Sequence, residues 1–269
     1  MPESGSKPPG SPARRPRVTV ALAMSADGRI TPDGRAPVTF PSREDRRHLF
    51  RLRDAADAIL ATGATLRAED PPLLPDEPRR QARAATGLSP NPWRVILSSR
   101  LELPFDGRAL RPRSQAPVVF LCGSEAPADR RRRAEAIGTV IVSEAAEVEL
   151  EAALSTLAAE LGVRHLLAEG GGRLTGRLLA LGLVDELWLT ICPLLFGGDG
   201  PTPCDGVGFS LAGAPRLRLL SCRPHGGEIF AHYAVETPGE TAGNPVAAPD
   251  VEAAEGSGAS SSKTTSEGR

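Results

Sequence analysis

Short apolar runs alternate with helical patterns along most of this chain, and this alternation limits the fold more than any other feature. The first run, residues 17–24 (RVTVALAM), is almost continuously hydrophobic, which is typical of a strand covered on both faces. Two late runs, 216–222 and 228–235, are typical of an antiparallel pair joined through residues 224–227. The pattern also predicts strands at 57–62, 93–98, 117–121, 139–142, 164–168 and 185–193, and helices from the capping Ser42 to about 56, at 127–137, at 147–161 and from about 172 to 181.

These elements predict an α/β sandwich, in which helices cover a mixed, mostly parallel central sheet that ends in antiparallel strands. The chain has 269 residues, 40% of them hydrophobic, which suffices for one large domain or at most two. We expect that domain at residues 17–236. Residues 1–16 and 237–269 are rich in Pro, Gly, Ser and other small or polar residues, and we expect both tails to be disordered.

The charge and hydropathy patterns exclude several classes of partner. The formal net charge is −1, so no overall field attracts nucleic acid or an anionic membrane. The longest apolar stretch, 187–196, is too short to span a bilayer. The basic N-terminal segment has no apolar region behind it, so we expect no secretory signal and a cytoplasmic protein. The basic run 129–133 is expected to be a solvated helix face rather than a nucleic-acid patch.

Lysine and cysteine usage limit the chemistry. The only lysines, Lys7 and Lys263, lie in the two tails, so the domain has no lysine for a Schiff base, a Walker-type phosphate loop or a Ser–Lys pair. The spacing of the cysteines does not predict a zinc site, and we expect no metal. All four are expected to be buried free thiols: Cys122, Cys192, Cys204 and Cys222.

The segment 165–179 (HLLAEGGGRLTGRLL) is the strongest candidate for a ligand site. A predicted strand runs into three consecutive glycines, and a helix follows. Glycines allow a ligand to approach the backbone, and the free N–H groups of a helix start favour a phosphate. Thr175 replaces the third glycine of the dinucleotide fingerprint, and no Walker lysine follows. A plain strand-to-helix turn is the alternative, but it does not require three glycines.

Two further segments follow predicted strands, where α/β sheets bind ligands. Residues 62–71 (TGATLRAEDP) offer hydroxyl, carboxylate and guanidinium groups, although a helical turn ended by Pro71 explains them as well. Residues 24–30 (MSADGRI) place Asp27 at the end of the first strand. A solvated turn aspartate before glycine is an equally good explanation of Asp27.

Taken in order, MSADGRI, LRDAADAILATGATLRAEDP, WRVILSSRLELP and LLAEGGGRLTGRLLALGLVDELWLTICPLLFGG resemble the riboflavin-biosynthesis reductase family that acts on 5-amino-6-(5-phosphoribosylamino)uracil. The resemblance covers nearly all of residues 17–236. It implies a dihydrofolate-reductase-like three-layer sandwich, NADPH as the cofactor, hydride transfer that converts a ribosyl group to a ribityl chain, and a homodimer, for which strand 187–195 is a candidate surface.

The same resemblance assigns roles to individual residues. Substrate contacts fall on Asp27, Arg53, Leu73 and Glu169, of which Asp27 and Glu169 are the candidate catalytic residues. Arg53 would clamp the substrate phosphate, although a solvated helical arginine is the alternative. Asp27 would orient or protonate the reacting end. Contacts to the cofactor fall on Ala23, Thr65, Glu69, Ser99, Gly170, Gly171, Gly172, Arg173, Leu174, Thr175 and Gly176.

The sequence departs from the family pattern at three places. Asp76 stands where the family has a phosphate-binding arginine, which Arg79 or Arg80 could replace. Ala64 and Glu69 also replace the usual glycine and aspartate. The H-x-E and P-C-x-x-C motifs of the zinc deaminase are absent, so we expect a stand-alone reductase. Reduction of another pterin, imine or carbonyl compound is an alternative, as is a nucleotide-binding module without activity.

Overall fold

The computed structural model describes residues 15–32, 40–111 and 116–236. Residues 1–14 and 237–269, which make up most of the two predicted tails, lie outside this described part. Within it, no helix is long and apolar enough to cross a membrane.

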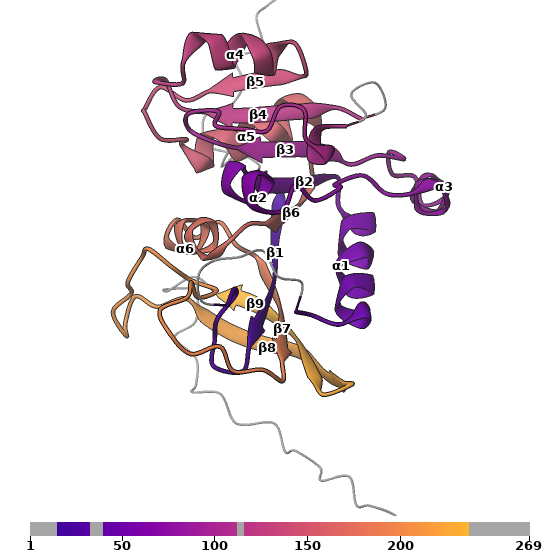
Figure 1. Cartoon of the computed structure of the whole chain (residues 1–269), viewed down its shortest axis with the longest axis vertical. Helices are drawn as coiled ribbons and strands as arrows, with labels where there is room; N and C mark the ends of the chain where they lie inside the picture. Colours follow the sequence, from indigo (N-terminus) through magenta and orange to yellow (C-terminus); the bar gives the residue numbers. More distant parts are fainter. Residues whose placement is uncertain (1–14, 33–39, 112–115, 237–269) are drawn as a thin grey trace, which may run out of the picture. The chain divides into compact units, whose positions relative to one another are not determined.

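A single nine-stranded sheet forms the centre of the domain, in the order β5-β4-β3-β2-β6-β1-β7-β9-β8 (Figure 1). All pairs from β5 to β7 are parallel, whereas β9 is antiparallel to both β7 and β8. The predicted mixed sheet with an antiparallel ending is therefore confirmed. The strands are β1 (Arg17–Ser25), β2 (Ala58–Thr62), β3 (Trp93–Leu97), β4 (Val118–Cys122), β5 (Thr139–Val142), β6 (His165–Glu169), β7 (Glu186–Cys192), β8 (Arg216–His225) and β9 (Glu228–Glu236).

Helices cover both faces of this sheet. Successive residues of each strand point to opposite sides, so each face contributes to its own core. Leu150 and Leu154 of α5 and Leu174 of α6 belong to one core, together with Val18 and Val20 of β1. The opposite core contains Ile59 of β2, Leu66 of α2 and Ala134 of α4. The helices are α1 (Arg43–Ala55), α2 (Gly63–Ala68), α3 (Glu77–Ala85), α4 (Ala128–Glu135), α5 (Leu150–Leu161) and α6 (Gly172–Ala180), with a 3₁₀ turn η2 (Arg108–Leu110).

Helix α1 begins where its sequence predicts. The Ser42 hydroxyl accepts hydrogen bonds from the backbone N–H groups of Glu44 and Asp45, which satisfies two donors of the first turn. Ser42 is itself held by the buried carboxylate of Glu228 in β9, at 2.8 Å from its backbone N. This contact ties the start of α1 to the antiparallel end of the sheet.

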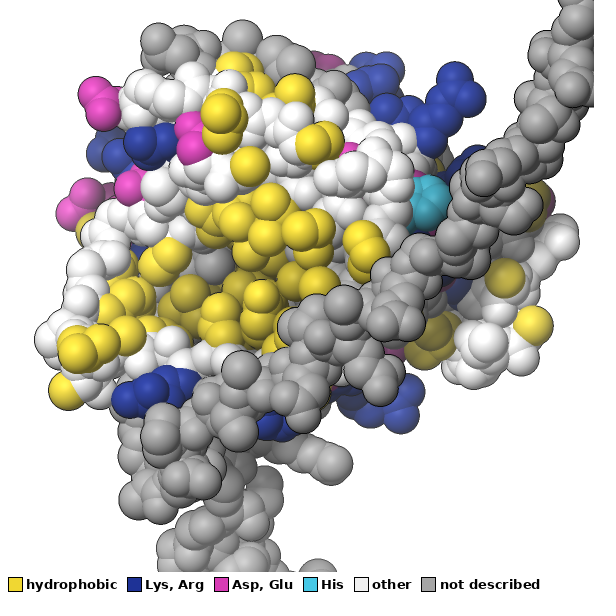
Figure 2. All heavy atoms as spheres, turned by 90° about the horizontal axis from the view of Figure 1, so that it is seen from below, with side chains coloured by type: hydrophobic (Ala, Val, Ile, Leu, Met, Phe, Trp, Pro, Cys, Tyr) yellow, Lys and Arg dark blue, Asp and Glu magenta, His cyan; other side chains and the backbone are white. Residues whose placement is uncertain are grey.

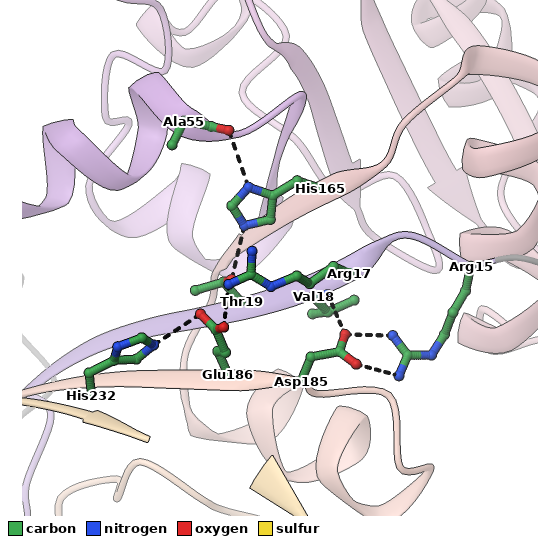
Figure 3. Close-up of polar contacts among 9 residues, drawn as sticks. All are labelled: Arg15, Arg17, Val18, Thr19, Ala55, His165, Asp185, Glu186 and His232. Atoms are coloured by element: carbon green, nitrogen blue, oxygen red, sulfur yellow. Dashed lines mark hydrogen bonds and ion pairs between the residues drawn. The ribbon is translucent and has the colours of Figure 1, made fainter. Parts of the chain in front are cut away.

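Polar contacts hold the amino-terminal ends of the central strands together (Figure 3). The Asp185 carboxylate accepts two hydrogen bonds from Arg15 and one from the N–H of Val18. The next residue, Glu186 at the start of β7, bridges Arg17 of β1 and His232 of β9. The described structure therefore begins to make specific contacts at Arg15, two residues before the predicted start of the domain.

Several predicted elements differ in extent from the observed ones. The helix expected at 147–161 begins only at Leu150, and α3 was not predicted at all. In the hairpin between β8 and β9, the turn is shorter than expected, because Gly226 and Gly227 both adopt positive φ, of 60° and 86°. Two-residue turns of this kind favour glycine at both positions, so the ladder extends to His225 paired with Glu228.

The expectation that all four cysteines are buried is wrong. Cys222 is exposed and Cys204 is only half-buried, whereas Cys122 and Cys192 are buried. Cys222 is exposed because β8 is an edge strand on which every residue is exposed. In segment 187–195, the candidate dimer surface, Leu187 belongs to the core, whereas Leu194 and Leu195 are 41% and 78% exposed.

Candidate active site

The parallel sheet opens between β1 and β6. Pairing between these strands ends at Val20 and Ala168, whereas β1 continues alongside β7 as far as Ser25. Glu169 is the last residue of β6, and the chain turns there into α6. The carboxyl ends of neighbouring parallel strands are where α/β sheets bind ligands. This opening therefore collects the residues with which a ligand would interact.

The glycines at the start of α6 and within it have two distinct roles. Gly171 is exposed, has φ −73° and receives no side-chain cap, and a Cβ added there would meet only Ile30 Cδ1, at 3.9 Å. A Cβ on Gly172 would instead lie 1.9 Å from the carbonyl O of Thr202, and one on Gly176 2.6 Å from that of Asp205. Gly171 thus leaves space for a ligand, while Gly172 and Gly176 allow a neighbouring loop to pack on α6.

The other predicted cofactor residues of this segment divide in the same way. Arg173 is exposed beside the helix start, whereas the side chains of Leu174 and Thr175 are buried. Gly170 is buried too, and a Cβ there would collide with Leu174 at 2.5 Å. Of the predicted cofactor residues 170–176, only Gly171 and Arg173 are therefore exposed to solvent.

Arg53 and Glu169 form a buried ion pair at the opening of the sheet. Arg53 Nε and Nη2 each donate a hydrogen bond of 2.6 Å to one carboxylate oxygen of Glu169, and Nη1 donates to the carbonyl O of Pro72. Both side chains are nearly enclosed, with 10% and 12% of their surface exposed. Burial would lower the pKa of Arg53, but the charge and hydrogen bonds of Glu169 raise it above its ordinary value. The alternative of a solvated arginine is therefore wrong.

Helix α2 brings Thr65 and Glu69 to the same edge of the sheet. The Thr62 side chain caps the helix by accepting from the N–H of Thr65, and Glu69 ends it. Loss of solvation and then the nearby Glu169 carboxylate raise the pKa of Glu69. The charge of Glu169 thus acts on Glu69. The next segment buries Leu73 in the core on the side of α2.

Asp27 is engaged by two loops. Its carboxylate accepts hydrogen bonds from the Ser25 hydroxyl, the N–H of Phe196 and the N–H of Gly197. These contacts, led by Ser25, lower the pKa of Asp27 to about 2. Arg29 reinforces the same junction by donating to the carbonyls of Gly198 and Gly200. Asp27 is therefore ionised at neutral pH, and it organises the loop after β7, which the sequence did not indicate.

Asp76 has a structural role. Its side chain accepts from the N–H of Arg79 and caps α3. The guanidinium of Arg79 lies 4.0 Å from the centre of the Phe50 ring. Phe50 is on α1, one turn before Arg53. Arg79 Nε also donates to Asp76 Oδ1 at 3.1 Å, and Arg80 pairs with Glu77. Of the two candidates for the missing phosphate-binding arginine, Arg79 is thus the one directed toward α1.

The remaining predicted residues lie on both sides of the opening. Ala23 is on the part of β1 that pairs only with β7, opposite Thr190. Ser99 follows β3, and its hydroxyl donates to Glu147 at 2.7 Å. The sequence did not reveal this contact, because nothing distinguishes Glu147 among the neighbouring glutamates of residues 144–151. In the described ranges, no group of three or more His, Cys, Asp or Glu residues could hold a metal ion.

The open parallel sheet, the free helix start and the antiparallel ending define an α/β protein of the dihydrofolate-reductase-like class. Among solved structures, Acinetobacter baumannii RibD matches with a TM-score of 0.68 at 22% identity, covering 82% of this chain and 58% of that one. A pyrimidine reductase-like protein from Corynebacterium diphtheriae also gives 0.68, at 24% identity, covering 82% and 92%. These matches confirm the predicted fold.

The RibD C-terminal domain family matches residues 16–231, and the chain belongs to this family. Two relatives are named 2,5-diamino-6-ribosylamino-4(3H)-pyrimidinone 5′-phosphate reductase. The protein from Archaeoglobus fulgidus is 37% identical over 197 residues, covering 72% of this chain and 89% of the relative. The one from Methanothermobacter thermautotrophicus is 34% identical over 229 residues, covering 82% and 99%. The predicted family is thereby confirmed.

Proposed function

We propose that this chain reduces a ribosylaminopyrimidine 5′-phosphate, converting its ribosyl group to a ribityl chain in riboflavin biosynthesis. The observation that carries this proposal is the buried Arg53–Glu169 pair beside the free N-terminus of α6. A sugar phosphate needs both hydrogen-bond acceptors for its hydroxyls and cationic donors for its phosphate, and this edge of the sheet provides both.

The residues around α6 fit a nicotinamide dinucleotide, and we propose NADPH. Gly171 leaves the space that a side chain would fill, and the uncapped N–H groups of the first turn with exposed Arg173 suit a pyrophosphate. Thr65 lies at the start of α2, which follows β2, the other neighbour of β6 in the sheet. The bound nicotinamide would supply the hydride, so the protein itself needs to orient the two reactants and exclude water.

The substrate would lie between α1 and the end of β6. Glu169 accepts hydrogen bonds from sugar hydroxyls, and Arg53 fixes the direction of its carboxylate. Arg79, held over Phe50, is the candidate partner of the substrate phosphate in place of the arginine lost at position 76. Asp27 remains ionised, so we propose that it positions the reacting end through the loop at Phe196 and Gly197 and does not donate a proton.

The names of the relatives favour one form of the pyrimidine. The Archaeoglobus and Methanothermobacter proteins are named for the 2,5-diamino compound, whereas the Escherichia coli relative is the riboflavin biosynthesis protein RibD. That relative is 27% identical, and the match spans 59% of its length. We therefore propose the diamino ribosylaminopyrimidinone phosphate as the preferred substrate, and the deaminated uracil as the poorer one.

We also propose that the chain forms a homodimer through the antiparallel end of its sheet. Figure 2 shows hydrophobic side chains gathered on the face seen from below in Figure 1, the end at which β7, β9 and β8 lie. Strand β8 lies at the edge of the sheet, and every one of its residues is exposed. Its partly exposed large apolar residues, together with one on β9, are Leu217, Leu219, Leu220 and Ile229. An edge and apolar face of this kind favour pairing with a second copy.

The test of the proposed reaction is oxidation of NADPH, followed by its absorbance, with each of the two pyrimidines as the substrate. We expect turnover with both, a higher kcat/KM for the diamino compound, and the ribityl product in each case by mass spectrometry. Binding of NADPH without turnover of either compound would contradict the proposed reaction but not the cofactor site.

A further inference from the structure

We propose that Glu147 weakens the discrimination between NADPH and NADH, because its carboxylate occupies the position of the cofactor's 2′-phosphate. This inference rests on the proposed dinucleotide site. It concerns a residue outside every motif that the sequence analysis singled out.

The direction in which the adenine-nucleotide half of the cofactor would extend follows from the residues around α6. On the side of β1 and β7, the loop at Thr202 and Asp205 packs directly on the helix, where Gly172 and Gly176 leave no room for a Cβ. The N–H of Asp205 also donates to the carbonyl O of Gly172. A dinucleotide whose pyrophosphate lies at Gly171 must therefore extend its nucleotide half the other way, over the ends of β2, β3 and β4.

Ser99, Glu147 and Arg177 meet at that end of the sheet. The Ser99 hydroxyl donates to Glu147 Oε2 at 2.7 Å, and Arg177 Nη1 lies 3.6 Å from the same oxygen. A hydroxyl and a guanidinium are the donors that a 2′-phosphate requires. In this chain the Glu147 carboxylate already occupies both donors. The Glu147 side chain is 72% exposed, so a ligand can reach the cluster.

The backbone on both sides of Glu147 is fixed. A Cβ on Gly123 would lie 1.7 Å from the carbonyl O of Ala146, and the N–H of Ser124 donates to the carbonyl O of Ala145. Beyond Glu147, Val148 is buried, and its carbonyl O accepts from Arg177 Nη2 at 2.8 Å. The loop thus holds the carboxylate at Ser99 in a place set by close packing.

This arrangement has opposite effects on the two cofactors. A carboxylate can accept a hydrogen bond from the free 2′-hydroxyl of NADH, whereas it repels a 2′-phosphate and competes with it for Ser99 and Arg177. Removing the charge while keeping the shape should release both donors to the phosphate. The variant Glu147→Gln makes that change.

The experiment measures binding of 2′,5′-ADP and 5′-AMP, and of NADPH and NADH, by isothermal titration at one fixed ionic strength. For Glu147→Gln, we expect the affinity for 2′,5′-ADP relative to 5′-AMP to rise about tenfold, and the NADPH/NADH ratio to rise with it. The matched control is Glu144→Gln, which removes an exposed carboxylate from the same loop and should leave both ratios within twofold. Ser99→Ala in the Glu147→Gln background should reverse part of the gain.

The outcomes separate this inference from the proposed function. If all four ligands bind but the ratios of Glu147→Gln match those of the parent within twofold, Glu147 does not set the preference and this inference is overturned. If neither dinucleotide binds to the parent, the cofactor site itself is overturned. Thermal melting of each variant shows whether the fold is intact, and we expect no change for an exposed residue.

Discussion

Arg53 of α1 and Glu169 of β6 form a bidentate ion pair across 116 residues of sequence, with two hydrogen bonds of 2.6 Å. The pair fixes a helix to the end of a central strand at the point where the sheet opens. Each residue thereby satisfies the charge of the other. A substrate that binds here would meet a carboxylate whose direction is already set.

The first prediction concerns this pair. Glu169→Gln should lower the free energy of unfolding by roughly 3–5 kcal/mol, because it leaves the Arg53 charge buried without its partner. Turnover should fall about tenfold or more even where the variant is folded. Urea unfolding and steady-state kinetics measure the two effects. The control is the double variant Arg53→Gln/Glu169→Gln, whose loss of stability should be smaller than the sum of the two single losses.

The second prediction concerns Asp27 and pH. Its folded pKa of about 2 lies below the ordinary value of 3.8, so its hydrogen bonds stabilise the protein above pH 4 and lose their effect as the pH falls toward 2. Asp27→Asn should therefore be less stable than the parent at pH 5–7, and the difference should shrink between pH 4 and 2. Denaturant unfolding across this range tests it. A difference that stays constant with pH would show that the charge of Asp27 is not what matters.

The third prediction separates the two purposes of the glycines. Gly171→Val should melt like the parent but bind NADPH at least tenfold more weakly, because its side chain enters open space that the pyrophosphate would use. Gly172→Ala should cost about 1–3 kcal/mol of stability, since its Cβ overlaps the carbonyl O of Thr202. Calorimetric melting and titration with NADPH give both readings. Normal binding by Gly171→Val would mean that this segment is only a turn.

The fourth prediction concerns the substrate phosphate. Arg79→Ala should raise KM for the 5′-phosphorylated pyrimidine roughly tenfold or more, because it removes a charge-assisted contact. It should have little effect on KM for the dephosphorylated ribosylaminopyrimidine, if that compound is turned over. Arg80→Ala is the matched control on the same turn of α3 and should behave like the parent. Equal effects of the two substitutions would exclude Arg79 as the phosphate ligand.

The fifth prediction concerns the apolar face of β8. Leu219→Asp should convert the dimer to a monomer, because it places a charge in the proposed interface. Leu181→Asp changes a residue of the same exposure, 43%, after α6, and it should leave the dimer intact. Sedimentation equilibrium distinguishes the two. A parent protein that is monomeric at tens of micromolar would contradict the proposed dimer.

The sequence by itself determined the order and character of most elements. The near-continuous apolar runs of β1, β2 and β6 and the capping residue Ser42 are local signals, and the structure follows them. Helix α3 escaped prediction because its residues are mostly polar and its cap, Asp76, stands where the family pattern has an arginine. The glycine segment was visible in the sequence, but which of its glycines leaves space for a ligand was not.

Only the tertiary structure decided how the charged residues are used. The sequence shows a domain whose only strong cations are arginines, and it cannot show which of them are buried. Arg53 pairs with Glu169, while Arg83 and Arg94 are buried and donate to backbone carbonyls, Arg83 to those of Arg53 and Asp54 at the end of α1. Such contacts join residues that are 15 to 116 positions apart. Local sequence carries no signal for them, because they depend on how α1, α3 and the sheet pack together.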